Sequence, residues 1–259
     1  MMHVRLLWLV LGLVLVTHHG NADELPSAQL SNRPHVVMLV AEREYETMQS
    51  LKRFSEDQKK AYRFTIVVED SNDRNRLIGI DSLKTADLML VSVRRRTLPK
   101  DQLALIRKFV SQGKPVIGIR TASHAFSLRN KMPPEGRADW QDFDQVVFGG
   151  NYTNHHGNDL QVKLSFADSG SDHPLVRGID ADGNYSSSSS LYRVSPLAKG
   201  AKVLMRGQVK EHPAEPIAWT YRRADGGKSF YTSLGNAEDF RGQLLPSLLE
   251  NALVWGLSK

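Results

Sequence analysis

The chain has 259 residues, and 41% of them are hydrophobic, so it can bury the core of one large domain. It contains no cysteine, which excludes disulfide bonds and a thiol nucleophile. The formal net charge is +6, but basic and acidic residues are interspersed along the chain. We therefore expect no binding to nucleic acid.

The N-terminal segment predicts an exported protein. A basic start at Arg5 is followed by the apolar run Leu6–Val16 and by small residues at 20–22, the pattern of a signal peptide. We expect residues 1–22 to be cleaved, residues 23–33 to form a linker, and the protein to be periplasmic or secreted. An uncleaved anchor is the alternative, although this run is too short to span about 30 Å of hydrocarbon. No later segment predicts a transmembrane helix.

Strands and helices alternate in the first half of the chain. Four apolar runs predict buried strands: His35–Ala41, Phe64–Val68, Asp87–Val93 and Pro115–Ile119. Amphipathic spacing predicts helices over Glu46–Tyr62 and Pro99–Gln112, the second of which has Pro at its start and Gly113 after its end. Such alternation implies a parallel sheet with right-handed crossovers.

The second half is less regular. A long polar excursion, Asn130–Asp159, predicts a lid or a binding wall. Further strands are expected at Leu160–Phe166, Ala201–Val209, Pro216–Tyr221 and Lys228–Leu234. The serine run Ser186–Ser190 is typical of a flexible surface turn, and helical spacing predicts a last helix over Asp239–Leu257.

The segment KPVIGIRTASHAF predicts the location of a site. Its apolar strand ends at Ile119 and meets Arg120, Thr121, Ala122, Ser123 and His124, after which the sequence is compatible with a helix. In an open α/β sheet, ligands bind at the carboxyl ends of the strands, where side chains and free helix amides converge. We call this strand-to-helix junction the elbow.

Four phrases occur together in one order: PVIGIRTASHAF, VFGGNYTNHHGND, DHPLVRGID and PIAWTYRRADGGKSFYTSLGNAEDF. They resemble the trehalose-utilisation (ThuA-like) family of the class I glutamine amidotransferase-like superfamily. The resemblance covers residues 34–258 and implies a single flavodoxin-like domain, a three-layer α/β sandwich with a mainly parallel sheet. It also implies a role in carbohydrate metabolism.

Two departures from the family pattern bear on chemistry. Amidotransferases of this superfamily carry a cysteine at the elbow, where this chain has Arg120, and neither Thr121 nor Ser123 has an obvious partnered base. We therefore expect no glutamine amidotransferase activity. The late strand of the family commonly ends in Gly-His, whereas this chain has Gly235-Asn236, which leaves amide hydrogen bonding in place of a histidine role.

Candidate catalytic residues are His124 and His155, because histidine has a pKa near the working pH. Candidate substrate-binding residues share polar side chains near the expected carboxyl edge: Glu42, Arg120, Ser123, His156 and Asn236. Each has a plainer interpretation. His124 could be a core histidine bonded to a carbonyl, Glu42 could be a solvated surface residue, and Arg120 could pair with Glu42. Of the adjacent His155 and His156, only one should face a ligand, and we prefer His155.

Other residues receive weaker assignments. The triplet Arg94–Arg96 could bind an anion, with a solvated loop as the favoured interpretation. His173 precedes Pro174 and predicts a structural cap, whereas Trp140 could stack on a sugar face. Trp219 and Trp255 are expected in the core. We expect no cofactor; His124, His155 and Glu42 have ligand types suited to a divalent metal, but no close-spaced pair supports such a site.

These observations predict an exported protein that acts on a carbohydrate or modified (keto-)sugar. The ligand should lie in a cleft between the elbow and the 130–159 loop. The expected chemistry is non-covalent acid/base catalysis by a hydrolase or a lyase/isomerase. The alternative is a non-catalytic carbohydrate-binding or interaction domain that kept the fold without the elbow nucleophile.

Overall fold

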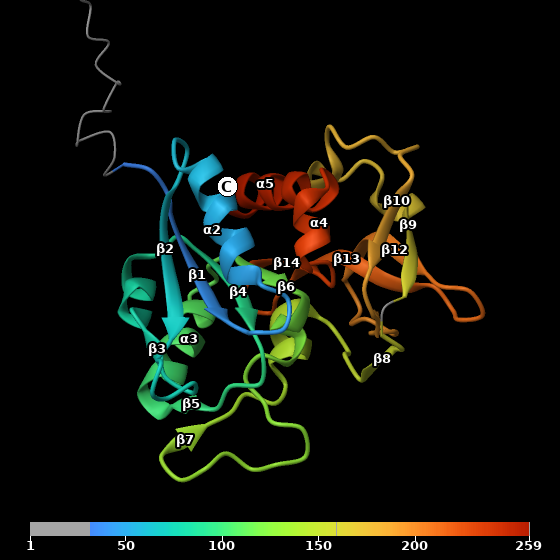
Figure 1. Cartoon of the computed structure of the whole chain (residues 1–259). Coiled ribbons are helices and arrows are strands. Elements are labelled where there is room, and N and C mark those ends of the chain that lie inside the picture. The colour runs from blue at the N-terminus through green and yellow to red at the C-terminus, as the bar shows by residue number, and fades with distance from the viewer. Residues whose placement is uncertain (1–31, 159, 259) are drawn as a thin grey trace, which may run out of the picture. The chain divides into compact units, whose positions relative to one another are not determined.

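A ten-stranded mixed sheet forms the centre of the chain (Figure 1). The structure is a computed structural model that describes residues 32–158 and 160–258. The predicted signal peptide (1–22) and nearly all of the predicted linker (23–33) lie outside the described residues. Within the described part, no helix is long and apolar enough to cross a membrane.

Five parallel strands occupy one half of this sheet. They are β1 (His35–Ala41), β2 (Arg63–Glu69), β4 (Leu88–Val93), β6 (Val116–Ile119) and β14 (Lys228–Thr232), in the spatial order β2-β1-β4-β6-β14. This is the flavodoxin-like order, in which the first strand lies between the second and the third. The predicted fold is therefore confirmed, including the parallel neighbours near residues 36, 88 and 116.

The other strands are antiparallel and extend both edges of the sheet. Beyond β14 lie β13 (Glu215–Arg222), β12 (Lys202–Gln208), β9 (Gln161–Phe166) and β10 (Tyr185–Ser188), and β3 (Leu77–Ile78) lies beyond β2. Two small antiparallel pairs stand apart from this sheet: β8 (Asn154–His156) with β11 (Leu191–Arg193), and β5 (Leu98–Pro99) with β7 (Arg137–Ala138).

Helices cover both faces because the central strands are apolar throughout. All seven residues of β1 are buried, and successive side chains of a strand point to opposite faces. Val36 and Met38 pack with helices α2 (Thr47–Gln58) and α5 (Leu244–Leu257). Val37 and Leu39 pack with α3 (Lys100–Ser111). In Figure 1, α2 and α5 lie together on one side of the sheet, where the Gln58 amide donates to Glu250 at 2.8 Å.

Three local expectations were wrong. The last helix is two helices, α4 (Ala237–Arg241) and α5, because the chain leaves helical geometry at Gly242. The elbow continues as a five-residue 3-10 turn (Arg120–His124), so it does not supply the free amides of a long helix. The serine run is an edge strand rather than a flexible turn, since Tyr185–Ser188 pairs with β9.

The excursion over residues 130–158 folds against the elbow through one aromatic ring. It contains a short π-helical turn, Asp144–Phe148, whose Phe148 side chain is fully buried. A Cβ added at Gly118 of β6 would come within 2.4 Å of that ring. Gly118 therefore lets the excursion approach the strand that ends at Arg120.

We predict that Gly118→Ala lowers the free energy of unfolding by about 1–3 kcal/mol, since the added methyl group overpacks a rigid contact. Urea denaturation measures this loss. Gly242→Ala is the control, because Gly242 has a φ of −72° and a Cβ there would meet atoms no closer than 3.6 Å. Equal stability of Gly118→Ala and the wild type would show that the contact is not tight.

Candidate functional site

Three adjacent cavities lie at the carboxyl ends of β1, β4 and β6. The serine cavity, of about 570 Å³, is lined by Arg120, Tyr45 and Ser188–Ser190. The arginine cavity, of about 350 Å³, is lined by Arg94, Arg95, Arg129, His124 and His155. The aspartate cavity, of about 440 Å³, is lined by His124, Ser123 and Asp144. The arginine cavity shares lining residues with both others, and we call the three together the groove.

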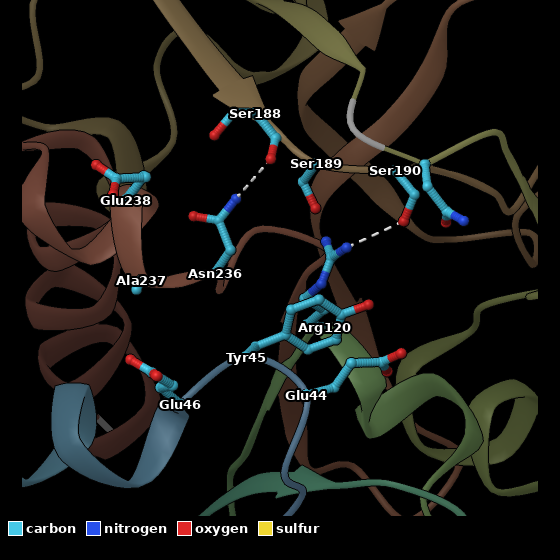
Figure 2. A pocket seen from close by; sticks show the side chains of 11 residues that line it. Glu44, Tyr45, Glu46, Arg120, Ser188, Ser189, Ser190, Asn236, Ala237 and Glu238 are labelled. Atoms are coloured by element: carbon cyan, nitrogen blue, oxygen red, sulfur yellow. Dashed lines mark hydrogen bonds between the residues drawn. The ribbon is translucent and has the colours of Figure 1, made fainter.

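Arg120 is the buried cation of the serine cavity (Figure 2). Its side chain is 2% exposed, and its guanidinium donates to the Ser233 carbonyl at 2.8 Å and to the Ser190 hydroxyl at 3.0 Å. The guanidinium lies 4.1 Å from the ring centre of Tyr45 and 4.9 Å from that of Tyr192. Its Nε has no partner. Aromatic rings thus stabilise the charge and leave hydrogen-bonding capacity unused.

Glu42 does not pair with Arg120, so that interpretation was wrong. Its carboxylate accepts the backbone N–H groups of Glu44 at 2.8 Å, Tyr45 at 2.9 Å and Thr47 at 3.0 Å. Glu42 therefore organises the loop before α2 and lines none of the three cavities. Its effect on the groove is indirect, because it fixes the loop that carries Tyr45.

Asn236 lines the serine cavity, and its amide is already engaged. Its Oδ1 accepts the Asp239 N–H at 2.8 Å in a capping box that begins α4, and its Nδ2 donates to the Ser188 carbonyl at 3.3 Å (Figure 2). Asn236 therefore joins α4 to β10 across the floor of the cavity. The serines themselves were missed in the sequence, where their run was taken for a surface turn.

His124 is buried beside Ser123. Its Nδ1 lies 3.1 Å from the Ser123 hydroxyl, and that hydroxyl can donate to the Arg120 carbonyl at 3.4 Å. In the tautomer with the His124 proton on Nδ1, this hydroxyl accepts from the ring and Nε2 is left as an acceptor. The ring stacks on Tyr152 at 4.6 Å. Burial lowers the pKa of His124 well below its usual value, and nearby arginines, Arg95 first, lower it further.

Asp144 is a further residue of the groove that the sequence analysis missed. It is 3% exposed, its Oδ2 accepts the Tyr152 N–H at 2.8 Å, and its Oδ1 has no partner. Burial raises the pKa of Asp144 to about 7. A Cβ at Gly150 would come within 2.2 Å of Oδ1, so this glycine makes room for the carboxyl group. The pair Gly149-Gly150 was the one available signal in the sequence.

His155 and His156 point to different surroundings. His155 lines the arginine cavity, and its Nδ1 donates to the Gly157 carbonyl at 2.8 Å. His156 lies outside the groove, with its Nε2 3.6 Å from Glu215 and its ring 4.4 Å from that of His212. His156 therefore lines none of the three cavities, and its substrate contact stays a prediction.

Other expectations are resolved by packing. Trp140 is buried against Phe143 and lies under Arg107, so it cannot stack on a sugar. His173 accepts the Leu175 N–H at 3.2 Å, which confirms its predicted role as a cap. The fully buried Trp219 belongs to the core, as expected.

The residues considered for a divalent metal are not brought together. His124 and His155 line the arginine cavity, whereas Glu42 turns into the loop before α2. Among the residues that the structure describes, no group of three or more His, Asp or Glu side chains has the arrangement of a metal site.

Comparison with known proteins agrees with this fold. The family model described as ThuA, trehalose utilisation, matches residues 35–256. The chain belongs to the ThuA family. A ThuA-like protein of Bacteroides uniformis has a similar structure, with a TM-score of 0.64 and 16% identity over 88% of this chain and 94% of that chain. One from Parabacteroides merdae gives a TM-score of 0.62 and 15% identity over 87% and 90%. A comparison with curated proteins gave no match.

The raised pKa of Asp144 predicts how stability changes with pH. The carboxyl stays protonated in the folded chain up to about pH 7, whereas in the unfolded chain it ionises near 3.8. Stability therefore falls as pH rises through this window, by on the order of 4 kcal/mol in total. We predict that Asp144→Asn gains stability relative to the wild type between pH 4 and pH 7.5 in urea denaturation.

Asp142→Asn is the matched control, since Asp142 is exposed two residues away. It should change stability little at either pH. A stability difference between Asp144→Asn and the wild type that does not vary with pH would show that Asp144 is ionised in the folded chain.

Proposed function

We propose that this ThuA-family protein binds a carbohydrate in the groove and transforms it by proton transfer. The serine cavity supports the binding half of this proposal. Hydroxyl groups of Ser188–Ser190, the carboxylates of Glu44, Glu46 and Glu238, and the guanidinium of Arg120 all line it. Sugar hydroxyls both donate and accept hydrogen bonds, so this mixed set matches them. Its volume of about 570 Å³ is in the range of small-molecule sites.

The pairing of His124 and Asp144 supports the catalytic half, and it carries the proposal. Both line the aspartate cavity, and Tyr152 links them by stacking on one and donating its N–H to the other. Near neutral pH, His124 is unprotonated and can accept a proton, while Asp144 keeps a large protonated fraction and can donate one. When the environment shifts the pKa values of two titrating groups in opposite directions, one group is suited to act as the acid and the other as the base.

The proposed step needs no covalent intermediate. In hydrolysis, His124 Nε2 removes a proton from water as the water oxygen bonds to the sugar carbon, and Asp144 protonates the oxygen that departs as its C–O bond breaks. In elimination, His124 removes a C–H proton and Asp144 again protonates the departing oxygen. In isomerisation of a keto-sugar, His124 removes the C–H proton next to the carbonyl and Asp144 protonates the carbonyl oxygen, with no group expelled. Exchange with water then restores both groups. Hydrolysis and elimination or isomerisation both use this pair. Glutamine hydrolysis does not fit, since the elbow position holds Arg120 and the chain has no cysteine.

Binding without catalysis is the second candidate. It is favoured by the separation of the hydroxyl-rich serine cavity from His124 and Asp144, neither of which lines it. A carbohydrate-binding domain would use Arg120 and the serines and would have no need of the acid and the base.

The proposal includes export of the protein. Its support is the run Leu6–Val16 followed by small residues at 20–22. Mass spectrometry of the protein from its native host should give an N-terminus at Asp23. An intact residue 1 on the isolated protein would contradict cleavage.

The function is tested by a thermal-shift screen of disaccharides and keto-sugars, followed by assays of product formation. With a ligand in hand, we predict that His124→Gln and Asp144→Asn each lower kcat by about 10²-fold or more, with little change in Kd. The pH profile of kcat should fall above about pH 7, where Asp144 ionises. Unchanged binding with no turnover in the wild type would favour the binding domain, and no ligand among carbohydrates would contradict both.

Arg120 provides a separate test of the binding cavity. We predict that Arg120→Lys weakens carbohydrate binding by about tenfold, because lysine keeps the charge but loses the planar fork of donors. Calorimetry measures the Kd, and thermal denaturation monitors the fold. Arg223→Lys is the control: Arg223 is also buried, but it bonds to Val110 and Lys114 at the other end of β6. Equal effects of the two substitutions on Kd would contradict a direct contact between Arg120 and the carbohydrate.

A further inference from the structure

Charge is segregated along the groove. Three carboxylates (Glu44, Glu46 and Glu238) and one guanidinium line the serine cavity. Three guanidiniums (Arg94, Arg95 and Arg129) and one carboxylate line the arginine cavity. Lys131 adds a further cation in the adjoining aspartate cavity. The electrostatic potential should therefore be negative in the serine cavity and positive in the arginine cavity. Such a difference orients a ligand that carries charge on one side.

The arginine cavity holds more positive charge than residues 32–158 and 160–258 neutralise. Arg94 pairs with Glu44 at 2.7 Å. Arg95 and Arg129 have no carboxylate partner within 4.0 Å among the described residues, although Arg95 is half-buried. Burial lowers the pKa of Arg95, and the nearby charge of Arg129 lowers it further. Two like charges held together at a concave surface are unfavourable without a counter-ion.

The backbone fixes Arg95 in this position. Its φ of 49° is in the left-handed region, and its N–H donates to the His124 carbonyl at 3.1 Å. A non-glycine residue in this conformation is strained, and such strain occurs preferentially at ligand sites. The neighbouring Arg96 is buried and is neutralised by Glu69, with which it pairs at 2.5 Å.

We propose that the arginine cavity binds the anionic group, a carboxylate or a phosphate, of an acidic sugar. The inference rests on the proposed function, because it assigns the sugar ring and its hydroxyls to the serine cavity. The two cavities share Glu44, Tyr45 and Asn158, so one small molecule can reach both. Arg95 and Arg129 provide forked donors, which match a planar carboxylate or a phosphate.

This subsite adjoins His124. His124 lines both the arginine cavity and the aspartate cavity, so a bound anion would lie beside its imidazole. In the free protein the arginines disfavour a second positive charge there. An anion would offset part of that field and make His124 a stronger base when the substrate is in place.

Calorimetry with four probes tests the proposal: glucose, glucuronate, glucose 6-phosphate and inorganic phosphate. We expect glucuronate or glucose 6-phosphate to bind at least about tenfold more tightly than glucose, with an advantage that declines as salt increases. Whichever charged sugar binds more tightly identifies a carboxylate or a phosphate as the natural group.

Arg95→Gln and Arg129→Gln should each remove most of the advantage of the charged sugar over glucose. Arg177→Gln is the control with the same loss of charge, because Arg177 is exposed and lines none of the three cavities. Circular dichroism of all three variants checks that they are folded. An advantage that is lost equally in Arg177→Gln would reflect net charge alone and overturn the subsite.

The outcomes separate this inference from the proposed function. Charged sugars that bind no better than glucose, or no binding by any probe, would overturn the anionic subsite. Measurable glucose binding in the first case would leave the carbohydrate function intact. Inorganic phosphate that binds as tightly as glucose 6-phosphate, with the same loss in Arg95→Gln, would support the subsite but contradict a role for the sugar ring.

Discussion

The rest of the groove depends on a buried guanidinium at the end of a parallel strand. Arg120 has a φ of 46°, a conformation that favours glycine, and its carbonyl accepts the Tyr231 hydroxyl at 2.5 Å. Its side chain is held by the Ser233 carbonyl and the Tyr45 ring. The elbow therefore turns sharply and presents His124 to the cavities. This strand end projects a residue toward the groove, and we propose that Arg120 binds the ligand there.

Packing behind the elbow shifts the pKa values of the proposed acid and base, Asp144 and His124. Phe148 lies against Gly118, which draws the turn that carries Asp144 into the protein interior. Its carboxyl group then has one backbone donor and one unpartnered oxygen, and burial favours the neutral acid. On the other side of Tyr152, burial lowers the pKa of His124 and the nearby arginines lower it further. Two opposite pKa shifts thus arise from one arrangement of glycines, aromatic rings and cations.

The fold was predictable from the sequence because buried parallel strands such as His35–Ala41 are continuous apolar runs. The elbow was predictable because polar residues follow such a run at Arg120. Local patterns could not reveal Asp144, whose burial depends on Phe148 meeting Gly118 from a distant strand. They also misassigned Glu42, since backbone N–H groups a few residues later occupy a carboxylate that the sequence shows only as polar. The surroundings of Asp144 and Glu42 come from contacts made in the folded chain, which the sequence pattern does not show.

A crystal structure of the protein with glucose 6-phosphate or glucuronate bound tests the account most directly. It should place sugar hydroxyls within hydrogen-bonding distance of Arg120 and Ser190, and the anionic group against Arg95 and Arg129. The part of the sugar nearest the aspartate cavity should lie between His124 and Asp144. A ligand bound outside the groove, or one whose acidic group faces Glu46 and Glu238 in the serine cavity, would contradict the account.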